Sequence, residues 1–143
     1  MSRKIYLDTG VIMLNFVSEP IEQIKNIFSR IHNKEVKAFI LEPALEEIAF
    51  HLCINYGKDK VETYIASFIY DYDIQCIKPE IQLIQKAGVL KCQYRSILSY
   101  FDALMIEFSL KNKLEFHTTE KKLRKKFPAK IVNKLRIITY RYD

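Results

Sequence analysis

The sequence predicts an α/β protein built as a three-layer sandwich, in which helices cover both faces of a central, mainly parallel sheet. Short runs rich in β-branched and aromatic residues alternate along the chain with longer segments that carry apolar residues at helical spacing. Parallel strands need long crossover connections, and this alternation supplies them. Because 143 residues with 49% apolar content suffice for one core, we expect a single domain over residues 1–143.

The expected strands are the apolar and β-branched runs of the chain. They lie at residues 4–8, 36–40, 114–119 and 135–140. Residues 73–79 form either a strand or an extended connector.

Helices are expected in the segments between these strands. Ser18 is placed to cap the first of them, and Pro43 suits the first turn of the next. Gly88 is expected to end a later helix, and Ser99 to begin the longest one. In chain order the helical segments are predicted at 18–32, 41–52, 60–72, 79–88, 99–113 and 120–127.

The charge of the chain is uneven. Residues 111–143 contain eleven Lys or Arg and three acidic residues, a net charge of +8, against +6 for the whole chain. An excess of this kind favours contact with a polyanion such as RNA, although a solvated surface gives the same pattern. The side chains expected to bind RNA phosphates are Lys121, Lys122, Arg124, Lys125 and Lys126.

Other compositional features exclude several classes of protein. The three cysteines are widely separated and lack a C-x-x-C pair, so neither a disulfide framework nor a cysteine zinc site is expected. Neither an apolar leader nor an apolar run of membrane-spanning length is visible in the sequence. We therefore expect a cytoplasmic protein with no membrane partner.

Acidic residues follow the expected strands. Asp8 comes after the first strand, Glu46 or Glu47 lies early in the helix after the second, Asp102 lies in the first turn of the long helix, and Glu120 follows the strand at 114–119. The carboxyl ends of parallel strands meet at one edge of a sheet, where ligands bind. Converging carboxylates repel one another unless a proton or cation compensates, and hard oxygen ligands select Mg²⁺ or Mn²⁺. Such a site would activate water for phosphodiester hydrolysis.

Each acid also has a purely structural interpretation. Asp8 could cap the helix that follows it, Ser99 and Asp102 form the S-x-x-D pattern of a capping box, and the glutamates could offset helix dipoles. The tripeptide Asp-Thr-Gly that begins at Asp8 also presents the catalytic acid of aspartic proteases. Those proteins are all-β and rich in glycine, whereas this chain is helix-rich and has three glycines.

Three segments in order resemble the PIN-domain ribonucleases, whose largest branch comprises the VapC-type toxins. "YLDTGVIM" is similar to the family's opening strand and acid. "PALEEIAFHL" is similar to the segment with the second acid, where a glutamate directly precedes an apolar residue, which favours Glu47 over Glu46. In "SYFDALMIEFSLKNKLEFHTTE", Asp102 opens a helix as in the family, and Thr118 and Glu120 fall at the offsets of its Thr-x-Asp pattern.

The resemblance implies a PIN-like sandwich and a Mg- or Mn-dependent endoribonuclease. It also offers one biological role for such an enzyme, that of the toxin in a toxin–antitoxin pair. Asp8, Glu47 and Asp102 would be catalytic metal ligands, Glu120 a fourth acid with the same roles, and Thr118 a supporting residue. The resemblance also implies RNA as substrate, a homodimer and a small antitoxin as protein partner.

Two positions depart from the family pattern. Gly10 stands where Ser or Asn is usual, and Glu120 stands where Asp is usual. The alternative function is therefore a catalytically weakened PIN-like subunit that binds RNA or another protein. Returning both positions to the family residues is expected to leave cleavage unchanged or raise it. His117, next to Thr118, could face an RNA phosphate.

Overall fold

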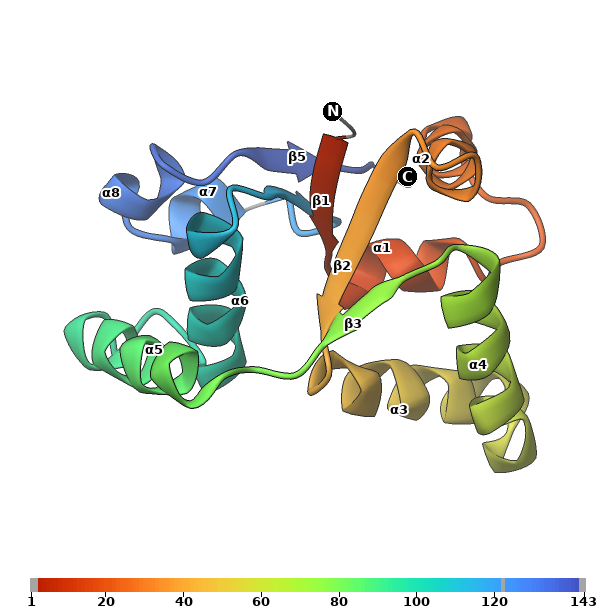
Figure 1. The fold of residues 1–143 in the computed structure, drawn as a ribbon, viewed down its shortest axis with the longest axis horizontal. Helices are drawn as coiled ribbons and strands as arrows, with labels where there is room; N and C mark the ends of the chain where they lie inside the picture. Colours follow the sequence, from red (N-terminus) through yellow and green to blue (C-terminus); the bar gives the residue numbers. More distant parts are fainter. Residues whose placement is uncertain (1–2, 122, 142–143) are drawn as a thin grey trace.

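The computed structural model describes residues 3–121 and 123–141, and these contain a five-stranded sheet in which every strand is parallel to its neighbours (Figure 1). The strand order is β3-β2-β1-β4-β5. The strands are β1 (Arg3–Leu7), β2 (Val36–Leu41), β3 (Gln75–Ile77), β4 (Glu115–Thr118) and β5 (Ile137–Thr139). The predicted α/β fold class is thus confirmed, and the segment at 73–79 contains a strand.

Helices cover both faces of this sheet. α1 (Thr9–Leu14), α2 (Glu22–His32), α3 (Ala44–Tyr56) and α4 (Val61–Asp71) share one core with the sheet, and α5 (Ile81–Gln93), α6 (Tyr100–Lys111), α7 (Leu123–Lys126) and α8 (Ala129–Val132) share the other. A short 3-10 turn (Lys58–Lys60) separates α3 from α4. None of the helices in the described part of the chain combines the length and apolar character that crossing a membrane requires.

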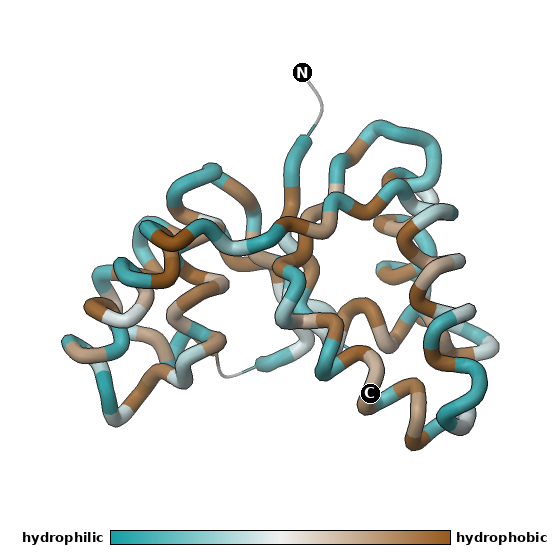
Figure 2. The backbone as a smooth tube through the Cα atoms, turned by 60° about the horizontal axis from the view of Figure 1, so that its bottom comes forward, coloured by the Kyte–Doolittle hydropathy of each residue, from teal (hydrophilic) through white to brown (hydrophobic). Residues whose placement is uncertain are grey.

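Alternation along the strands divides the apolar side chains between the two cores. In β1, Ile5 and Leu7 join the core of α1–α4, whereas Tyr6 joins the core of α5–α8. The Tyr6 ring stacks on Phe116 of the neighbouring strand β4, with ring centroids 5.6 Å apart. The helices alternate between hydrophobic and hydrophilic residues along their length (Figure 2), as expected for segments with one buried face.

The winding of the chain creates a break in direction between β1 and β4. After β1 the chain runs through α1 and α2 to β2, and then through α3 and α4 to β3. From β3 it returns through α5 and α6 to β4, which lies on the other side of β1. Connections from the two central strands therefore leave on opposite faces of the sheet. In open α/β sheets the crevice at such a point, beyond the carboxyl ends of the strands, is where ligands bind. Asp8 follows β1 directly, and Thr118 is the last residue of β4.

Several helix boundaries differ from the sequence predictions, and at two of them a residue expected to cap or end a helix does not do so. Ser18 is exposed and caps no helix: α2 begins at Glu22, with Ile21 at its N-cap position and no side-chain cap. Gly88 lies inside α5, which continues to Gln93. A glycine costs a helix only about 1 kcal/mol relative to alanine, and the buried Leu90 beyond it keeps this helix packed on the core.

A buried polar network joins β1, β4 and the end of β5. His117 is fully buried, its Nδ1 lies 2.7 Å from the Tyr140 hydroxyl, and its Nε2 lies 3.1 Å from Glu115 Oε1. Arg3 donates to the same carboxylate at 2.7 Å. Burial lowers the pKa of His117 to about 4. Burial alone would raise the pKa of Glu115, but hydrogen bonds from His117 and Arg3 and the charge of Arg3 hold it below its usual value. His117 therefore does not face RNA, one of the roles considered for it, because the ring is enclosed in this network.

We expect the stability of the fold to fall as the pH drops from 6.5 towards 4. The pKa of His117 moves from 6.5 in the unfolded chain to about 4 in the folded chain, so the unfolded chain binds one more proton in this interval. One such proton costs at most about 1.4 kcal/mol per pH unit. Urea unfolding at pH 7, 6 and 5 should show this loss in the parent and in a variant of the exposed His32, His32→Asn, and a smaller loss in His117→Asn. A parent whose unfolding free energy is constant from pH 7 to pH 5 would contradict the expectation.

Candidate active site

Asp8 lies at the junction of β1 and α1, where both of its carboxylate oxygens are engaged. Oδ1 accepts a hydrogen bond from the Thr9 N–H at 2.9 Å, which makes Asp8 the N-cap of α1. Oδ2 accepts a hydrogen bond from the Thr118 hydroxyl, also at 2.9 Å. The Asp8 N–H donates to the carbonyl oxygen of His117 at 2.9 Å. Asp8 thus does cap a helix, and it is fixed at the same time against the end of β4.

The environment of Asp8 disfavours the charged form of its carboxyl group. Burial raises the pKa of its carboxyl, the hydrogen bonds from Thr118 and Thr9 oppose that rise, and the negative charges of Glu47 and Asp102 add to it. The acids that act on Asp8 come from α3 and α6, on opposite faces of the sheet. The fold therefore brings three of the predicted acids into one electrostatic environment at the break between β1 and β4.

Asp102 has a structural role as well as a place in this cluster. Ser99 Oγ accepts from the Asp102 N–H at 3.0 Å, and Asp102 Oδ2 accepts from the Ser99 N–H at 3.1 Å, which completes a capping box at the start of α6. The same Oδ2 lies 3.3 Å from the ammonium of Lys126 in α7. The Asp102 side chain is only 15% exposed. Water therefore screens its carboxylate weakly, and a neighbouring positive charge interacts strongly with it.

The two glutamates predicted for the site are more open to solvent. Glu47 lies in the first turn of α3, and its Oε1 is 3.8 Å from His51 Nε2 one turn later. Glu120 is exposed, and its N–H donates to the Thr118 hydroxyl oxygen at 3.2 Å. Thr118 thus donates to Asp8 and accepts from the backbone of Glu120 with one hydroxyl group. The roles of Glu47 and Glu120 as ligands, and the choice of Glu47 over Glu46, stay predictions.

The donor set has the chemistry of a site for a hard divalent cation. Its ligand atoms are carboxylate oxygens, which Mg²⁺ and Mn²⁺ prefer, and a cation at this point would lower the raised pKa of Asp8. Within residues 3–121 and 123–141, however, no three His, Cys, Asp or Glu side chains are grouped so that they could hold a metal ion. Asp8, Glu47 and Asp102 thus interact electrostatically, but their side chains are not arranged as the ligands of one metal ion.

Gly10 leaves a notch that another residue fills. A Cβ atom at Gly10 would overlap Thr119 Oγ1 and would lie 3.3 Å from both Thr119 Cβ and Thr119 Cγ2. The absence of a side chain at position 10 is therefore matched by the presence of Thr119 in its place. Nothing in the sequence signalled this pairing, because the two residues lie more than a hundred positions apart.

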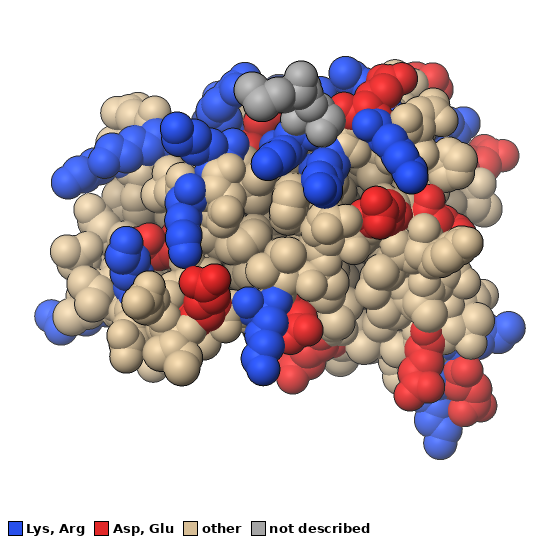
Figure 3. Space-filling model, in the orientation of Figure 1, with Lys and Arg blue, Asp and Glu red and all other residues tan. Residues whose placement is uncertain are grey.

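The basic residues predicted to bind RNA that the structure describes have different neighbours. Lys126 lies beside Asp102, whereas the Arg124 guanidinium donates to the Ile137 carbonyl oxygen of β5 at 2.8 Å. Lys121 and Arg124 line a groove of about 500 Å³ with Arg141 and strand β5. Lys125 is exposed, and Lys122 lies outside the described residues. Lys and Arg side chains gather over the upper left of the view, where α7, α8 and β5 lie (Figure 3).

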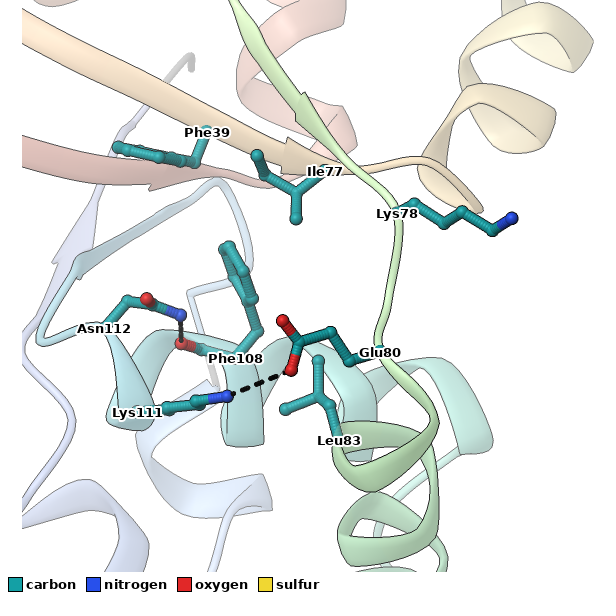
Figure 4. A pocket seen from close by; sticks show the side chains of 8 residues that line it. All are labelled: Phe39, Ile77, Lys78, Glu80, Leu83, Phe108, Lys111 and Asn112. Carbon is teal, nitrogen blue, oxygen red and sulfur yellow. Dashed lines mark hydrogen bonds and ion pairs between the residues drawn. The ribbon is translucent and has the colours of Figure 1, made fainter.

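A pocket of about 160 Å³ lies between the β2–β3 side of the sheet and α6, and none of the predicted acids lines it. Phe39, Ile77 and Phe108 form its apolar walls, and Glu80 and Lys111 approach each other across it with a 3.5 Å ion pair (Figure 4). Ligand pockets usually hold 300 Å³ or more. The acids at the strand ends, rather than this pocket, remain the candidate active site.

The chain has a PIN-like fold, in which helices cover both faces of a parallel five-stranded sheet, as the solved structures to which it is similar show. It aligns over 96% of its length with 98% of a chain in the structure of VapBC2 from Rickettsia felis bound to a DNA fragment from their promoter, with a TM-score of 0.73 and 16% identity. For DNA-bound VapBC from Salmonella typhimurium the coverage is 97% and 98%, the TM-score 0.69 and the identity 15%.

A third similar structure is VapC20 from Mycobacterium tuberculosis, a sarcin-ricin loop cleaving toxin. The alignment covers 78% of this chain and 85% of VapC20, with a TM-score of 0.61 and 13% identity. Comparisons of the sequence with family models and with curated proteins gave no match. The resemblance found in the sequence is therefore confirmed at the level of the fold.

We expect Asp8→Asn to stabilise the protein at pH 7. The pKa of Asp8 is raised above its usual 3.8 in the folded chain; its contribution to stability is full below that pH and is lost as the pH rises through the folded value. Asn keeps an oxygen for the Thr9 N–H and removes the charge. Thermal unfolding without divalent cations should show a higher midpoint for Asp8→Asn than for the parent at pH 7, and a smaller difference at pH 3.5.

The exposed Asp59 provides the control, because Asp59→Asn should leave the midpoint close to that of the parent at both pH values. A lower midpoint for Asp8→Asn at pH 7 would mean that its charged hydrogen bonds outweigh the cost of burying the charge.

We expect Gly10→Ser to destabilise the fold. The new Cβ meets Thr119, and overpacking of this kind costs about 1–3 kcal/mol. The double variant Gly10→Ser/Thr119→Ala should recover much of this loss, because the overlapping hydroxyl is gone. Urea unfolding of the parent, both single variants and the double variant measures the coupling. Strictly additive effects would show that positions 10 and 119 do not share the space.

Proposed function

We propose that this protein is a metal-dependent endoribonuclease that cleaves RNA as the toxin of a toxin–antitoxin pair. The observation that carries the proposal is the position of Asp8 at the end of β1, where the Thr118 hydroxyl at the end of β4 holds its carboxylate. Burial raises the pKa of this carboxyl, and the negative charges of Glu47 and Asp102 add to the rise. Asp8, Glu47 and Asp102 are the proposed ligands of Mg²⁺ or Mn²⁺, with Glu120 as a fourth acid. A divalent cation bound there supplies a Lewis acid that activates water and neutralises phosphodiester charge.

Each proposed residue has a definite task in this scheme. Thr118 orients the Asp8 carboxylate by donating to Oδ2, and the capping box fixes the Asp102 carboxylate at the start of α6. Lys121, Arg124 and Lys125 are proposed to hold RNA phosphates, and the groove beside β5 supports this role for the first two. Such contacts release counterions, so they supply affinity without sequence preference.

The similar structures support a protein partner for this chain. Several are toxin–antitoxin complexes, among them that of Klebsiella pneumoniae, aligned over 96% of this chain with a TM-score of 0.65. We propose a small antitoxin as partner and a homodimer as the form that binds it, in the cytoplasm. Exposed apolar side chains on α3, Phe50 and Ile54, provide surface for such contacts, with 58% and 68% of their area accessible.

The second candidate is a PIN-like subunit with weakened catalysis that binds RNA or a protein. Two observations favour it: among the residues that the structure describes, the acids are not grouped as a ligand set, and Glu120 is exposed at the position of the fourth acid. The two functions differ in whether the acid cluster hydrolyses RNA, and this can be measured directly.

Cleavage of single-stranded RNA at increasing Mg²⁺ or Mn²⁺ concentration tests the proposal. Asp8→Asn, Asp102→Asn and Glu47→Gln should each lose cleavage by orders of magnitude, because each removes a ligand charge. Glu46→Gln is the matched control, since it makes the same change one residue away in α3. Thermal unfolding of each variant checks that the fold persists. Equal cleavage by the parent and the Asp8→Asn variant would contradict the proposal, and a parent that binds RNA without cleaving it at any cation concentration would establish the second candidate.

A further inference from the structure

The ion pair between Lys126 and Asp102 places a cationic side chain of the protein itself within the candidate active site. Lys126 Nζ lies 3.3 Å from Asp102 Oδ2, and 40% of the Lys126 side chain is exposed against 15% for Asp102. Asp102 is one of the two acids whose charge acts on Asp8. The ammonium of Lys126 therefore offsets negative charge in this cluster.

The fold fixes the position of Lys126 through two neighbours, Leu123 at the start of α7 and Phe127 directly after it. Leu123 and Phe127 flank the basic residues and are each only 3% exposed, in the core that also contains Ala103 of α6. The Phe127 N–H donates to the Leu123 carbonyl oxygen at 2.9 Å. Because Phe127 is buried in the core, the backbone of the adjacent Lys126 is held close to the first turn of α6.

One stretch of chain serves two acids of the cluster. Thr118, at the end of β4, donates its hydroxyl hydrogen to Asp8, and Lys126, eight residues later, brings its ammonium to Asp102. The loop from β4 and the helix α7 thus act together on the carboxylates from β1 and α6. A bare cluster of acids would be destabilised by mutual repulsion, and this segment provides the compensation.

We propose that Lys126 is an internal counter-ion that competes with a divalent cation for Asp102, and so sets the affinity of the site for that cation. This inference rests on the metal site of the proposed function. A divalent cation bound by Asp102 would lie close to the ammonium, and like charges at such distances repel strongly in a partly buried site. Cation binding therefore requires that the Lys126 side chain turn away, for which its partial exposure leaves room.

Binding of Mn²⁺ alone, measured by calorimetry at fixed pH and ionic strength, tests the inference. Lys126→Met keeps much of the apolar stem and removes the charge, so we expect it to bind Mn²⁺ about two- to fivefold more tightly than the parent, the range that a partly exposed ion pair can contribute. Lys125→Met is the matched control, because it removes the same charge from the adjacent position. Its affinity should change by much less, and Lys126→Arg should stay near the parent.

Each outcome bears on a different part of the scheme. Equal or weaker Mn²⁺ binding by Lys126→Met than by the parent overturns the competition, as does an equal gain in Lys125→Met, which would show a general effect of charge. If Mn²⁺ binding in the parent is unchanged by Asp8→Asn, or if neither the parent nor Lys126→Met binds Mn²⁺, the metal site of the proposed function fails and this inference fails with it. Tighter binding confined to Lys126→Met, and lost on adding Asp8→Asn, supports both.

Discussion

The hydrogen bond from the Thr118 hydroxyl to Asp8 joins the ends of the two central strands at the point where the chain changes from one face of the sheet to the other. The rest of the candidate site depends on this contact. It fixes a buried carboxylate whose pKa is raised by burial and, in addition, by the charges of Glu47 in α3 and Asp102 in α6. The same hydroxyl also accepts a hydrogen bond from the Glu120 N–H beyond β4. The adjacent backbone bond from Asp8 to His117 extends the pairing of the two strands to the last position before they diverge.

Asp8 and Asp102 have structural roles beside the chemical one proposed for them. Asp8 caps α1 and Asp102 completes the capping box of α6, so the ends of two helices are secured by the same carboxylates that gather beyond the sheet. Helix N-termini stabilise negative charge, which offsets part of the repulsion between neighbouring acids. The interpretation of these residues as caps and their interpretation as ligands are therefore compatible, and the first helps to explain how the fold tolerates the second.

The sequence predicted the elements well where a single local signal decides the structure. The β-branched and aromatic run at residues 4–8 predicted β1, and the Ser99–Asp102 spacing predicted the start of α6. It failed where distant residues decide: the strand order, the burial of His117 by Tyr140 and Arg3, and the filling of the Gly10 notch all depend on contacts between segments far apart in the chain. Lys126 was recognised as basic, but its attachment to Asp102 follows only from the packing of α7.

The pairing of Gly10 with Thr119 also constrains how this chain can have diverged from its relatives. A side chain at position 10 would meet the Thr119 side chain in the present backbone, so a substitution at position 10 requires Thr119 to change its rotamer or be replaced. Among homologues, a larger residue at the first position should accompany a smaller or differently oriented residue at the second. Covariation of this kind would show that side-chain volume at the end of the sheet can be supplied from either position while Asp8 is kept.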